Sequence, residues 1–418
     1  MINGDWSSDV CSSDLETKDS TEQTNVEEVD FSSLGVNDNV VQALADMEIA
    51  DPSDIQKKVL PLLFQKKNVI AEAPCGSGKT IAFLAGIISA IDPNVQEIQA
   101  VYLAPTRELV LQTREVFDLV NKYSKLQNGV VVGPDSILKG HPHFLFGTAA
   151  SVAKLYKGKK IPFDKCKFLI LDEADELICA KSHRLSTLFL IKELRAIGAQ
   201  FGFFSATFSQ TATKQLTNAA GEITQVDVKA EKSTIQHWYT TISAGDPDKQ
   251  REEGIQALLE LNKVISTGQI YIFANRKDEV KLISEKLNEG KFECKGFSGD
   301  LTAAERDAII SEFRKETIKV LVATDVLQRG IDIPNTYLVV NWGFPCCKGK
   351  GTNISDSYSY IHRSGRAGRF GRSGICLSLI FNEEQEKYLK DVISKRPDIQ
   401  ELKKIDWHKF DELPKEQL

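Results

Sequence analysis

Residues 73–80 read APCGSGKT and decide the fold that we predict for this chain. They lie between an apolar run, residues 68–71, and a helical apolar run that begins at Ile81. A strand, a loop with two glycines and a helix form a phosphate cradle, because the glycines let successive backbone N–H groups point inward. Lys79 can then neutralise the β- and γ-phosphates while the Thr80 hydroxyl ligates Mg²⁺. Taken alone, the stretch also fits an ordinary glycine-bearing turn before a buried helix.

Composition limits the architecture and leaves a nucleic-acid partner open. The chain has 418 residues, too many for one ordinary core, so we expect two domains of roughly 200 residues. Its net charge is −6, and any polynucleotide must therefore be held by local basic and hydroxyl groups. The longest apolar run, residues 81–91, is far shorter than a membrane span. Because no apolar run is long enough to cross a bilayer, we expect no membrane partner. The eight cysteines lack metal-site spacing, which favours reduced thiols in an intracellular protein.

The N-terminal residues carry no fold signal. Residues 1–30 are rich in Ser, Asp, Glu and Thr with little periodic apolar content, so we predict a disordered extension. The first fifteen, MINGDWSSDVCSSDL, resemble adaptor-derived sequence in assembled transcripts and are excluded from fold prediction. The first domain is therefore expected from residue 31 to residue 228.

Polar residues follow the apolar runs of this first domain. The runs 100–104, 144–147, 168–171 and 201–204 are typical of buried parallel strands that alternate with helices. Because the carboxyl ends of parallel strands meet at the ligand edge of an open sheet, the polar residues after them are candidate ligand contacts. These residues are Thr106, Arg107, Thr148, Asp172, Glu173, Asp175, Ser205 and Thr207.

Three side chains suit ATP binding and hydrolysis in particular. Adjacent carboxylates after a buried strand are what a phosphate-loop ATPase needs: Asp172 holds Mg²⁺ through water, and Glu173 orients and deprotonates the attacking water. An acidic first helical turn is the alternative interpretation of this pair. The amide of Gln56 can read the adenine edge, since it both donates and accepts hydrogen bonds. A surface helix residue is the alternative for Gln56.

A second alternating series predicts a second domain of the same α/β class. Residues 229–235 are polar and form the linker, and strands and helices alternate through residues 236–395. This half has no phosphate loop but carries arginines among glycines, so we interpret the arginines as fingers that reach a nucleotide held by the first domain. A solvated basic loop is the alternative. The cluster comprises Arg363, Arg366, Arg369 and Arg372, and residues 396–418 are a tail without a motif.

From Phe31 to about residue 380 the chain resembles a DEAD-box RNA helicase. The family's motifs occur in order across both domains: PSDIQ at 52–56, APCGSGKT at 73–80, PTREL at 105–109, DEAD at 172–175, SAT at 205–207, TDVLQRGID at 324–332 and HRSGRAGR at 362–369. The resemblance implies two tandem RecA-like domains, each a doubly wound parallel sheet, joined by a short linker. Within the family, the stretch from Asn341 to Arg372 is most similar to the mRNA-export helicase of the nuclear pore's cytoplasmic face.

The resemblance also implies a role for each matching residue. The nucleotide would be held by Gln56, Ala73, Gly76, Ser77, Gly78, Lys79, Thr80, Gly330, Asp332, Arg366 and Arg369. Catalysis would be carried by Lys79, Asp172, Glu173, His362, Arg366 and Arg369, with Mg²⁺ on Thr80 and Asp172. Interdomain coupling would involve Asp175, Ser205 and Thr207. The RNA backbone would lie along Thr106, Arg107, Thr148, Arg276, Gly299 and Thr324.

Two departures from the family pattern bear on binding strength. Glu48-Ile49 replaces Gly-Phe before the adenine-reading motif, which removes an aromatic stack of about 0.5–1.5 kcal/mol. We therefore expect weaker ATP affinity. Ala149-Ala150 replaces Pro-Gly in a loop that places main chain near RNA, and a weaker grip on RNA follows.

The family mechanism that the resemblance implies is an ATP-gated clamp. ATP and single-stranded RNA would bind across the cleft, and closure would bring Arg366 and Arg369 onto the γ-phosphate, so hydrolysis waits for RNA. The clamp would unwind short duplexes locally or remodel RNA–protein complexes.

The resemblance also implies partners and a place in the cell. It implies a monomer of the cytoplasm and nucleus, at the cytoplasmic face of the nuclear pore. Its partners there would be a filament nucleoporin and an export activator that binds inositol hexakisphosphate.

Four alternatives stay open at this point. The chain could serve another RNA pathway such as translation initiation, or act as a catalytically weak RNA- or protein-binding module. A DNA-directed ATPase and a nucleotide kinase are the remaining two.

Overall fold

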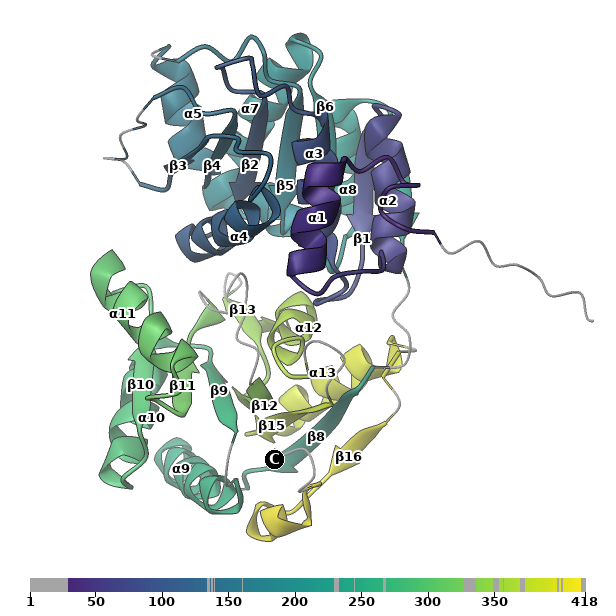
Figure 1. Cartoon of the computed structure of the whole chain (residues 1–418). Helices are drawn as coiled ribbons and strands as arrows, with labels where there is room; N and C mark the ends of the chain where they lie inside the picture. The colour runs from purple at the N-terminus through teal and green to yellow at the C-terminus, as the bar shows by residue number, and fades with distance from the viewer. Residues whose placement is uncertain are drawn as a thin grey trace, which may run out of the picture.

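The computed structural model describes residues 29–133, 136, 138, 140–159, 161–228, 233–243, 245–265, 268–325, 336–348, 353–355, 357–368, 373–396, 398–399 and 401–414. Within these residues the chain forms two domains, each with helices packed on both faces of a seven-stranded sheet (Figure 1). All strand pairs within both sheets are parallel. The predicted class, two tandem doubly wound parallel sheets, is confirmed.

The first sheet has the strand order β3-β4-β2-β5-β6-β1-β7. Three of its central strands are buried along their whole length, which is why they read as continuous apolar runs. Its strands are β1 (Val69–Glu72), β2 (Ala100–Ala104), β3 (Asn128–Val131), β4 (Phe144–Thr148), β5 (Phe168–Asp172), β6 (Gln200–Ser205) and β7 (Thr224–Asp227). Its helices are α1 (Asp38–Asp46), α2 (Asp54–Phe64), α3 (Lys79–Ala90), α4 (Arg107–Val120), α5 (Ala149–Lys157), α6 (Ala174–Cys179), α7 (Lys181–Ala196) and α8 (Gln210–Ala220).

The second sheet has the order β10-β11-β9-β12-β15-β8-β16. Its strands are β8 (Ile235–Thr241), β9 (Gln269–Ala274), β10 (Cys294–Phe297), β11 (Val320–Ala323), β12 (Thr336–Trp342), β15 (Gly374–Ile380) and β16 (Leu402–Lys404). Its helices are α9 (Pro247–Val264), α10 (Lys277–Glu289), α11 (Ala303–Arg314), α12 (Ser357–Ser364), α13 (Glu383–Ser394) and the 3₁₀ helix η2 (Trp407–Glu412). An antiparallel pair, β13 (Cys346–Lys348) and β14 (Asn353–Ser355), precedes α12.

Each sheet separates two apolar cores, one on each face. The helix predicted from the apolar run at residues 81–91 is α3, and it is buried on almost every side. Because α3 follows β1 directly through the phosphate loop, its rigid packing fixes the position of Lys79 at the sheet edge. No described helix is both long and apolar enough to cross a membrane.

The residues from 396 onward, which the sequence analysis set apart as a tail, extend the second domain. Strand β16 pairs with β8 at the sheet edge, and Phe410 and Leu413 are buried in the core that α9 covers. A three-residue strand and one 3₁₀ helix are too short to produce a periodic apolar pattern, so the sequence gives no sign of them.

Candidate functional site

The phosphate loop joins β1 to α3 in a conformation that requires its glycines. Gly76 has φ +77° and Gly78 has φ +94°, backbone angles that other residues rarely adopt. A Cβ on Gly78 would lie 2.5 Å from Nε2 of Gln56. A Cβ on Gly76 would meet nothing within 4 Å, so open space lies beside this part of the loop. The strand, loop and helix predicted from residues 73–80 are therefore present.

Two polar groups of the loop are suited to an anion. Nζ of Lys79 donates to the carbonyl oxygens of Ala73 and Pro74, both at 2.7 Å. Oγ of Ser77 is buried and has no hydrogen-bond partner among the described residues. A buried hydroxyl without a partner costs about 1–3 kcal/mol. A phosphate in the cradle would supply that partner and compete for the lysine, so these residues fit the predicted ligand.

Gln56 supports the phosphate loop from α2. Its Oε1 accepts from the backbone N–H of Ser53 at 2.8 Å, and its Nε2 donates to the carbonyl oxygen of Gly78 at 3.2 Å. Ser53 completes the link by donating to the carbonyl oxygen of Ser77 at 2.9 Å. One amide hydrogen and one oxygen lone pair of Gln56 remain for a base, so the adenine-reading role stays a prediction.

The segment before this helix keeps a glycine-like backbone without glycine. Glu48 has φ +60°, a conformation that costs a non-glycine residue about 1–2 kcal/mol. Ile49 beside it packs against the first-domain core while staying partly exposed. For this pair the sequence predicts only the loss of an aromatic stack. The structure adds that Glu48, at the family's glycine position, has a backbone conformation that favours glycine.

The paired carboxylates lie at the carboxyl end of β5. Asp172 is buried, its Oδ2 accepts from the Tyr102 hydroxyl at 2.9 Å, and its Oδ1 accepts from the Glu173 backbone N–H at 3.0 Å. Burial and the adjacent Glu173 carboxylate raise the pKa of Asp172 to about 7, against the lowering effect of Lys79. A buried carboxylate facing the loop lysine fits a divalent cation, which would favour the charged form.

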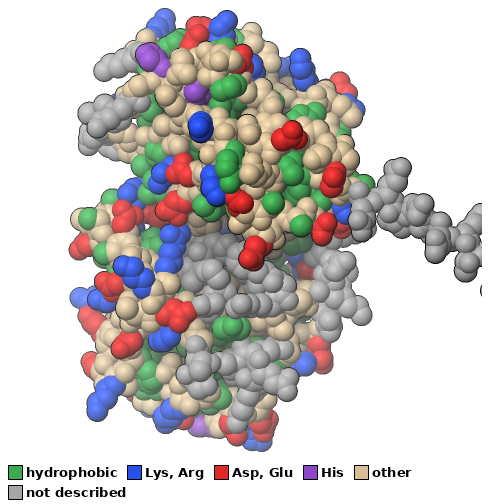
Figure 2. All heavy atoms as spheres, viewed as in Figure 1, with side chains coloured by type: hydrophobic (Ala, Val, Ile, Leu, Met, Phe, Trp, Pro, Cys, Tyr) green, Lys and Arg blue, Asp and Glu red, His purple; other side chains and the backbone are tan. Residues whose placement is uncertain are grey.

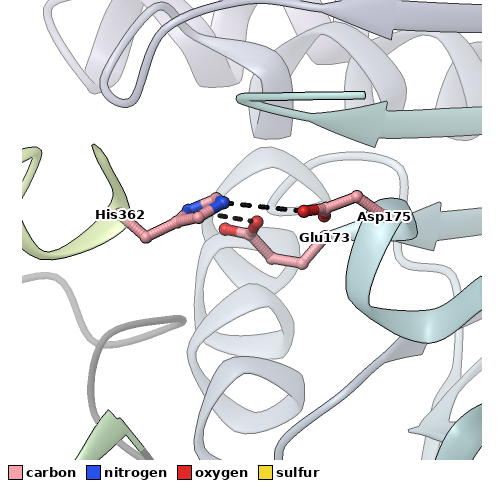
Figure 3. A group of neighbouring side chains, drawn as sticks. All are labelled: Glu173, Asp175 and His362. Atoms are coloured by element: carbon pink, nitrogen blue, oxygen red, sulfur yellow. Dashed lines mark ion pairs between the residues drawn. The ribbon is translucent and has the colours of Figure 1, made fainter. Parts of the chain in front are cut away.

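A chain of side chains connects the first domain to α12 of the second. Oγ of Ser205 donates to Asp175 at 2.7 Å, and the Thr207 hydroxyl lies 3.4 Å from both Asp175 and Nε2 of His362. His362 itself lies between two carboxylates, with Nδ1 3.6 Å from Glu173 and Nε2 3.7 Å from Asp175 (Figure 3). The three residues predicted to couple the domains thus contact the domain interface.

The arginine cluster divides into two kinds of residue. Gly365 packs against the phosphate loop, because a Cβ built on it would lie 3.1 Å from Sγ of Cys75. Arg366 follows at this contact and is 4% exposed. Arg363 is pinned inside its own domain by Asp325 at 2.6 Å and Asn275 at 2.9 Å, with its guanidinium over the Phe273 ring. The predicted residues Gly330, Asp332 and Arg369, with Arg372, lie outside the described residues.

The residues predicted to bind RNA lie at the same edges of the two sheets. Thr106 follows β2, and Thr148 ends the neighbouring strand β4. Arg276, Gly299 and Thr324 follow the adjacent strands β9, β10 and β11. Thr106 also caps α4, because its hydroxyl accepts from the Leu109 N–H at 3.2 Å. A Cβ on Gly299 would meet nothing within 4 Å, which leaves its backbone accessible.

Comparisons with known proteins agree with this geometry. Residues 53–216 match the DEAD/DEAH box helicase family, and residues 253–371 match the helicase conserved C-terminal domain. The chain is 33% identical to the ATP-dependent RNA helicase DBP5 of Kluyveromyces lactis, over 97% of this chain and 87% of that protein. It is 33% identical to DBP5 of Scheffersomyces stipitis, over 87% of this chain and 72% of that protein. The chain is a DEAD-box ATP-dependent RNA helicase.

Solved structures indicate which arrangement of the domains this helicase adopts. The chain superposes on S. cerevisiae Dbp5 L327V bound to RNA and ADP BeF3 with a TM-score of 0.84, at 30% identity over 93% of this chain and 98% of that chain. The same variant bound to gle1 h337r and ip6 gives a TM-score of 0.76 at the same identity and coverage. The two domains are therefore arranged more as in the RNA- and nucleotide-bound complex, and the RecA-like organisation is confirmed.

Three ion pairs between α4 and α11 of the helicase were missed by the sequence analysis. Glu108 accepts from Arg306 at 2.8 Å, and Arg107 donates to both carboxylate oxygens of Asp307 at 2.7 and 2.9 Å. A third pair joins Glu115 and Arg314 at 3.3 Å. Figure 2 shows acidic and basic side chains gathered at this side of the interface. Local sequence patterns hold no signal for these pairs, since their partners are about 200 residues apart.

Proposed function

We propose that this helicase works as an RNA clamp closed by ATP. The observation that carries the proposal is the contact of α12 with the ATP-site residues of the first domain. Gly365 packs on the phosphate loop at Cys75, and His362 lies beside Glu173 and Asp175. Closure therefore brings the second domain against the groups that bind and hydrolyse the nucleotide, so hydrolysis depends on the domains meeting.

The first domain holds the nucleotide in this proposal. The loop amides and Lys79 bind the phosphates, and Gln56 reads the adenine. Thr80 and Asp172 would hold Mg²⁺, which neutralises developing negative charge on the phosphates when it is bound. Glu173 orients and deprotonates the attacking water, since its carboxylate stands at the start of α6 beside Asp172.

The second domain completes the site. Arg366 and Arg369 stabilise the negative charge that develops on the γ-phosphate. An arginine finger contributes about 10³–10⁵ in turnover. Ser205, Thr207 and Asp175 couple the nucleotide site to His362 through the contacts described above.

RNA binds along the sheet edges that carry Thr106, Thr148, Arg276, Gly299 and Thr324. Contacts to phosphates and 2′-hydroxyls give an affinity that falls with salt, no base preference and discrimination against DNA. Closing on one strand of a short duplex bends it and releases the partner strand locally. Long-range unwinding is not part of this mechanism.

We further propose a role in mRNA export, with a monomer at the cytoplasmic face of the nuclear pore as well as in cytoplasm and nucleus. The support is similarity: relatives named DBP5, and S. cerevisiae dbp5 structures bound to gle1 with ip6 and to nup159. The corresponding partners here are an export activator with inositol hexakisphosphate and a filament nucleoporin. A pull-down with such a nucleoporin tests the role, and absence of binding counts against it.

Measuring ATP hydrolysis with saturating single-stranded RNA tests the clamp. We expect wild-type turnover to rise with RNA, to rise much less with single-stranded DNA, and to fall to background in Glu173→Gln. Equal turnover in wild type and Glu173→Gln would support a second candidate, a catalytically weak RNA-binding module. The observation that favours it is the replacement of Pro-Gly by Ala149-Ala150, which begin α5 directly after Thr148.

A further inference from the structure

Three side chains meet across the domain interface at a spacing that suits a transition-metal ion. Glu173 and Asp175 come from the start of α6, and His362 points between them from α12 (Figure 3). One oxygen of each carboxylate and one imidazole nitrogen all lie within 4.8 Å of one another. Metal bonds of about 2.0–2.2 Å in a tetrahedron place two ligand atoms about 3.3–3.6 Å apart. Side-chain movements of less than about 1 Å would therefore place all three on one ion.

The three side chains are buried, and none of the contacts among them is a short hydrogen bond. The distances from His362 to Glu173 and Asp175, 3.6 and 3.7 Å, exceed the roughly 2.7–2.9 Å of a charge-assisted hydrogen bond. Glu173 is 8% exposed, and its Oε2 accepts no hydrogen bond from any described residue. This buried oxygen is directed at the imidazole, so a negatively charged ligand atom already faces the centre of the cluster.

We propose that Glu173, Asp175 and His362 form an inhibitory zinc site that exists only when the domains are closed. An imidazole with two carboxylates is a ligand set that zinc favours, whereas Mg²⁺ prefers oxygen ligands in an octahedron. The site is therefore chemically distinct from the nucleotide's magnesium site. Because the ligands come from both domains, opening the clamp destroys the site.

Zinc then has two separable effects on the helicase. It ties α6 to α12, so RNA is released more slowly. It also occupies the Glu173 oxygen that faces the attacking water, so ATP hydrolysis slows. Competition between zinc and magnesium for the nucleotide would instead weaken RNA retention. The inference rests on the proposed function, because there the closed state is the state that holds RNA.

Zinc binding to the full chain closed on RNA with ADP and beryllium fluoride tests the site, in excess Mg²⁺ and a zinc buffer. We expect His362→Gln to bind zinc at least about 10-fold more weakly, since even losing a residue that only supports a metal ligand costs about 10–100-fold. His408→Gln, which alters an exposed histidine in η2, is the matched control and keeps wild-type affinity. Equal zinc affinity in the two variants overturns the proposal, as does an RNA release rate unchanged by zinc in the wild type.

Since His362→Gln can also impair closure, His362→Cys provides an independent readout. A thiolate is a good ligand for zinc and for its spectroscopic substitute Co²⁺. We expect His362→Cys to gain a sulfur-to-cobalt charge-transfer absorption over the wild type, and identical spectra overturn the assignment. RNA-stimulated hydrolysis in zinc-free buffer separates the two ideas. If it is missing, the proposed function fails; if it is present without zinc binding, only the zinc site fails.

Discussion

The two sides of the nucleotide cleft are built in opposite ways. On the first-domain side, Asp172 is a buried carboxylate with a raised pKa, Lys79 bonds to its own loop, and Ser77 has a buried hydroxyl without a described partner. On the second-domain side, Arg363 is fully buried and bonded to Asp325 and Asn275. The first-domain side therefore carries polar groups that a bound ligand would satisfy. On the second-domain side, the hydrogen bonds of Arg363 hold α12 in place and thereby position Arg366 beside Gly365.

Removing Arg366 should give the largest effect, because the proposed function assigns this side chain, with Arg369, to the γ-phosphate. We expect Arg366→Ala to lower RNA-stimulated turnover by about 10³-fold or more, with little change in protein stability. Arg366→Lys should recover only part of the loss, since an ammonium lacks the planar fork of a guanidinium. The measurement is steady-state hydrolysis with saturating RNA. Loss of less than tenfold in turnover would place the catalytic arginine elsewhere.

Replacing Arg363 tests whether this residue stabilises the second domain. Breaking a buried ion pair by removing one partner costs about 3–5 kcal/mol. The lower end applies here, because Asp325 is partly exposed. We expect Arg363→Met to destabilise the second domain by about 3 kcal/mol. Tryptophan fluorescence in urea follows this domain, since Trp238, Trp342 and Trp407 all lie in it.

Arg366→Ala is the control for this measurement. It should leave the urea midpoint of the second domain near the wild-type value. If both substitutions shift that midpoint equally, the assignment of a structural role to Arg363 and a nucleotide-site role to Arg366 is wrong.

The sequence predicts features that local patterns encode, but not contacts between residues that are far apart in the chain. Apolar runs predicted β2, β4, β5 and β6 because burial on both faces leaves a continuous local pattern. The phosphate loop was equally predictable, because its two glycines, Lys79 and Thr80 lie within five residues of sequence. By contrast, no local pattern reports that Gly365 touches Cys75 or that Glu108 pairs with Arg306. Those contacts depend on how two folded domains meet.

The sequence also cannot predict which of several similar residues in one motif has a structural role. Arg363 and Arg366 belong to one motif, yet one supports the fold and the other lies at the cleft. Only the positions of Asp325 and Asn275 distinguish them. Likewise, Glu48 adopts φ +60° where its side-chain type would not suggest it, since the surrounding chain enforces the turn.

The raised pKa of Asp172 gives the first-domain side a pH signature. Between about pH 4 and 7 the folded protein binds a proton there that the unfolded chain has lost, so stability falls as pH rises through this window. At pH 8 the full cost of the buried charge is present. We expect Asp172→Asn to raise the thermal midpoint at pH 8 without metal or nucleotide, and to change it little at pH 4. The expected gain in the free energy of unfolding is on the order of 4 kcal/mol, since a shift of about three pKa units corresponds to about 1.4 kcal/mol per unit.

The exposed Asp164 in the same domain provides the control. Asp164→Asn should leave the thermal midpoint unchanged at both pH values. A destabilised Asp172→Asn at pH 8 would mean that the carboxylate contributes to folding and is not held at a cost for its ligand.

The interdomain ion pairs carry the smallest effects, and they distinguish two roles for Arg107. Its pair with Asp307 is largely solvated, so a double-mutant cycle on RNA affinity with ADP and beryllium fluoride should give about 0.2–1 kcal/mol. Glu108 is buried against Arg306, and that cycle should give a larger coupling, because truncating Arg306 leaves a buried charge. If Arg107 instead binds the RNA backbone, Arg107→Ala will weaken RNA binding equally with and without Asp307→Ala. Coupling to Asp307 would instead show that Arg107 acts by holding the two domains together.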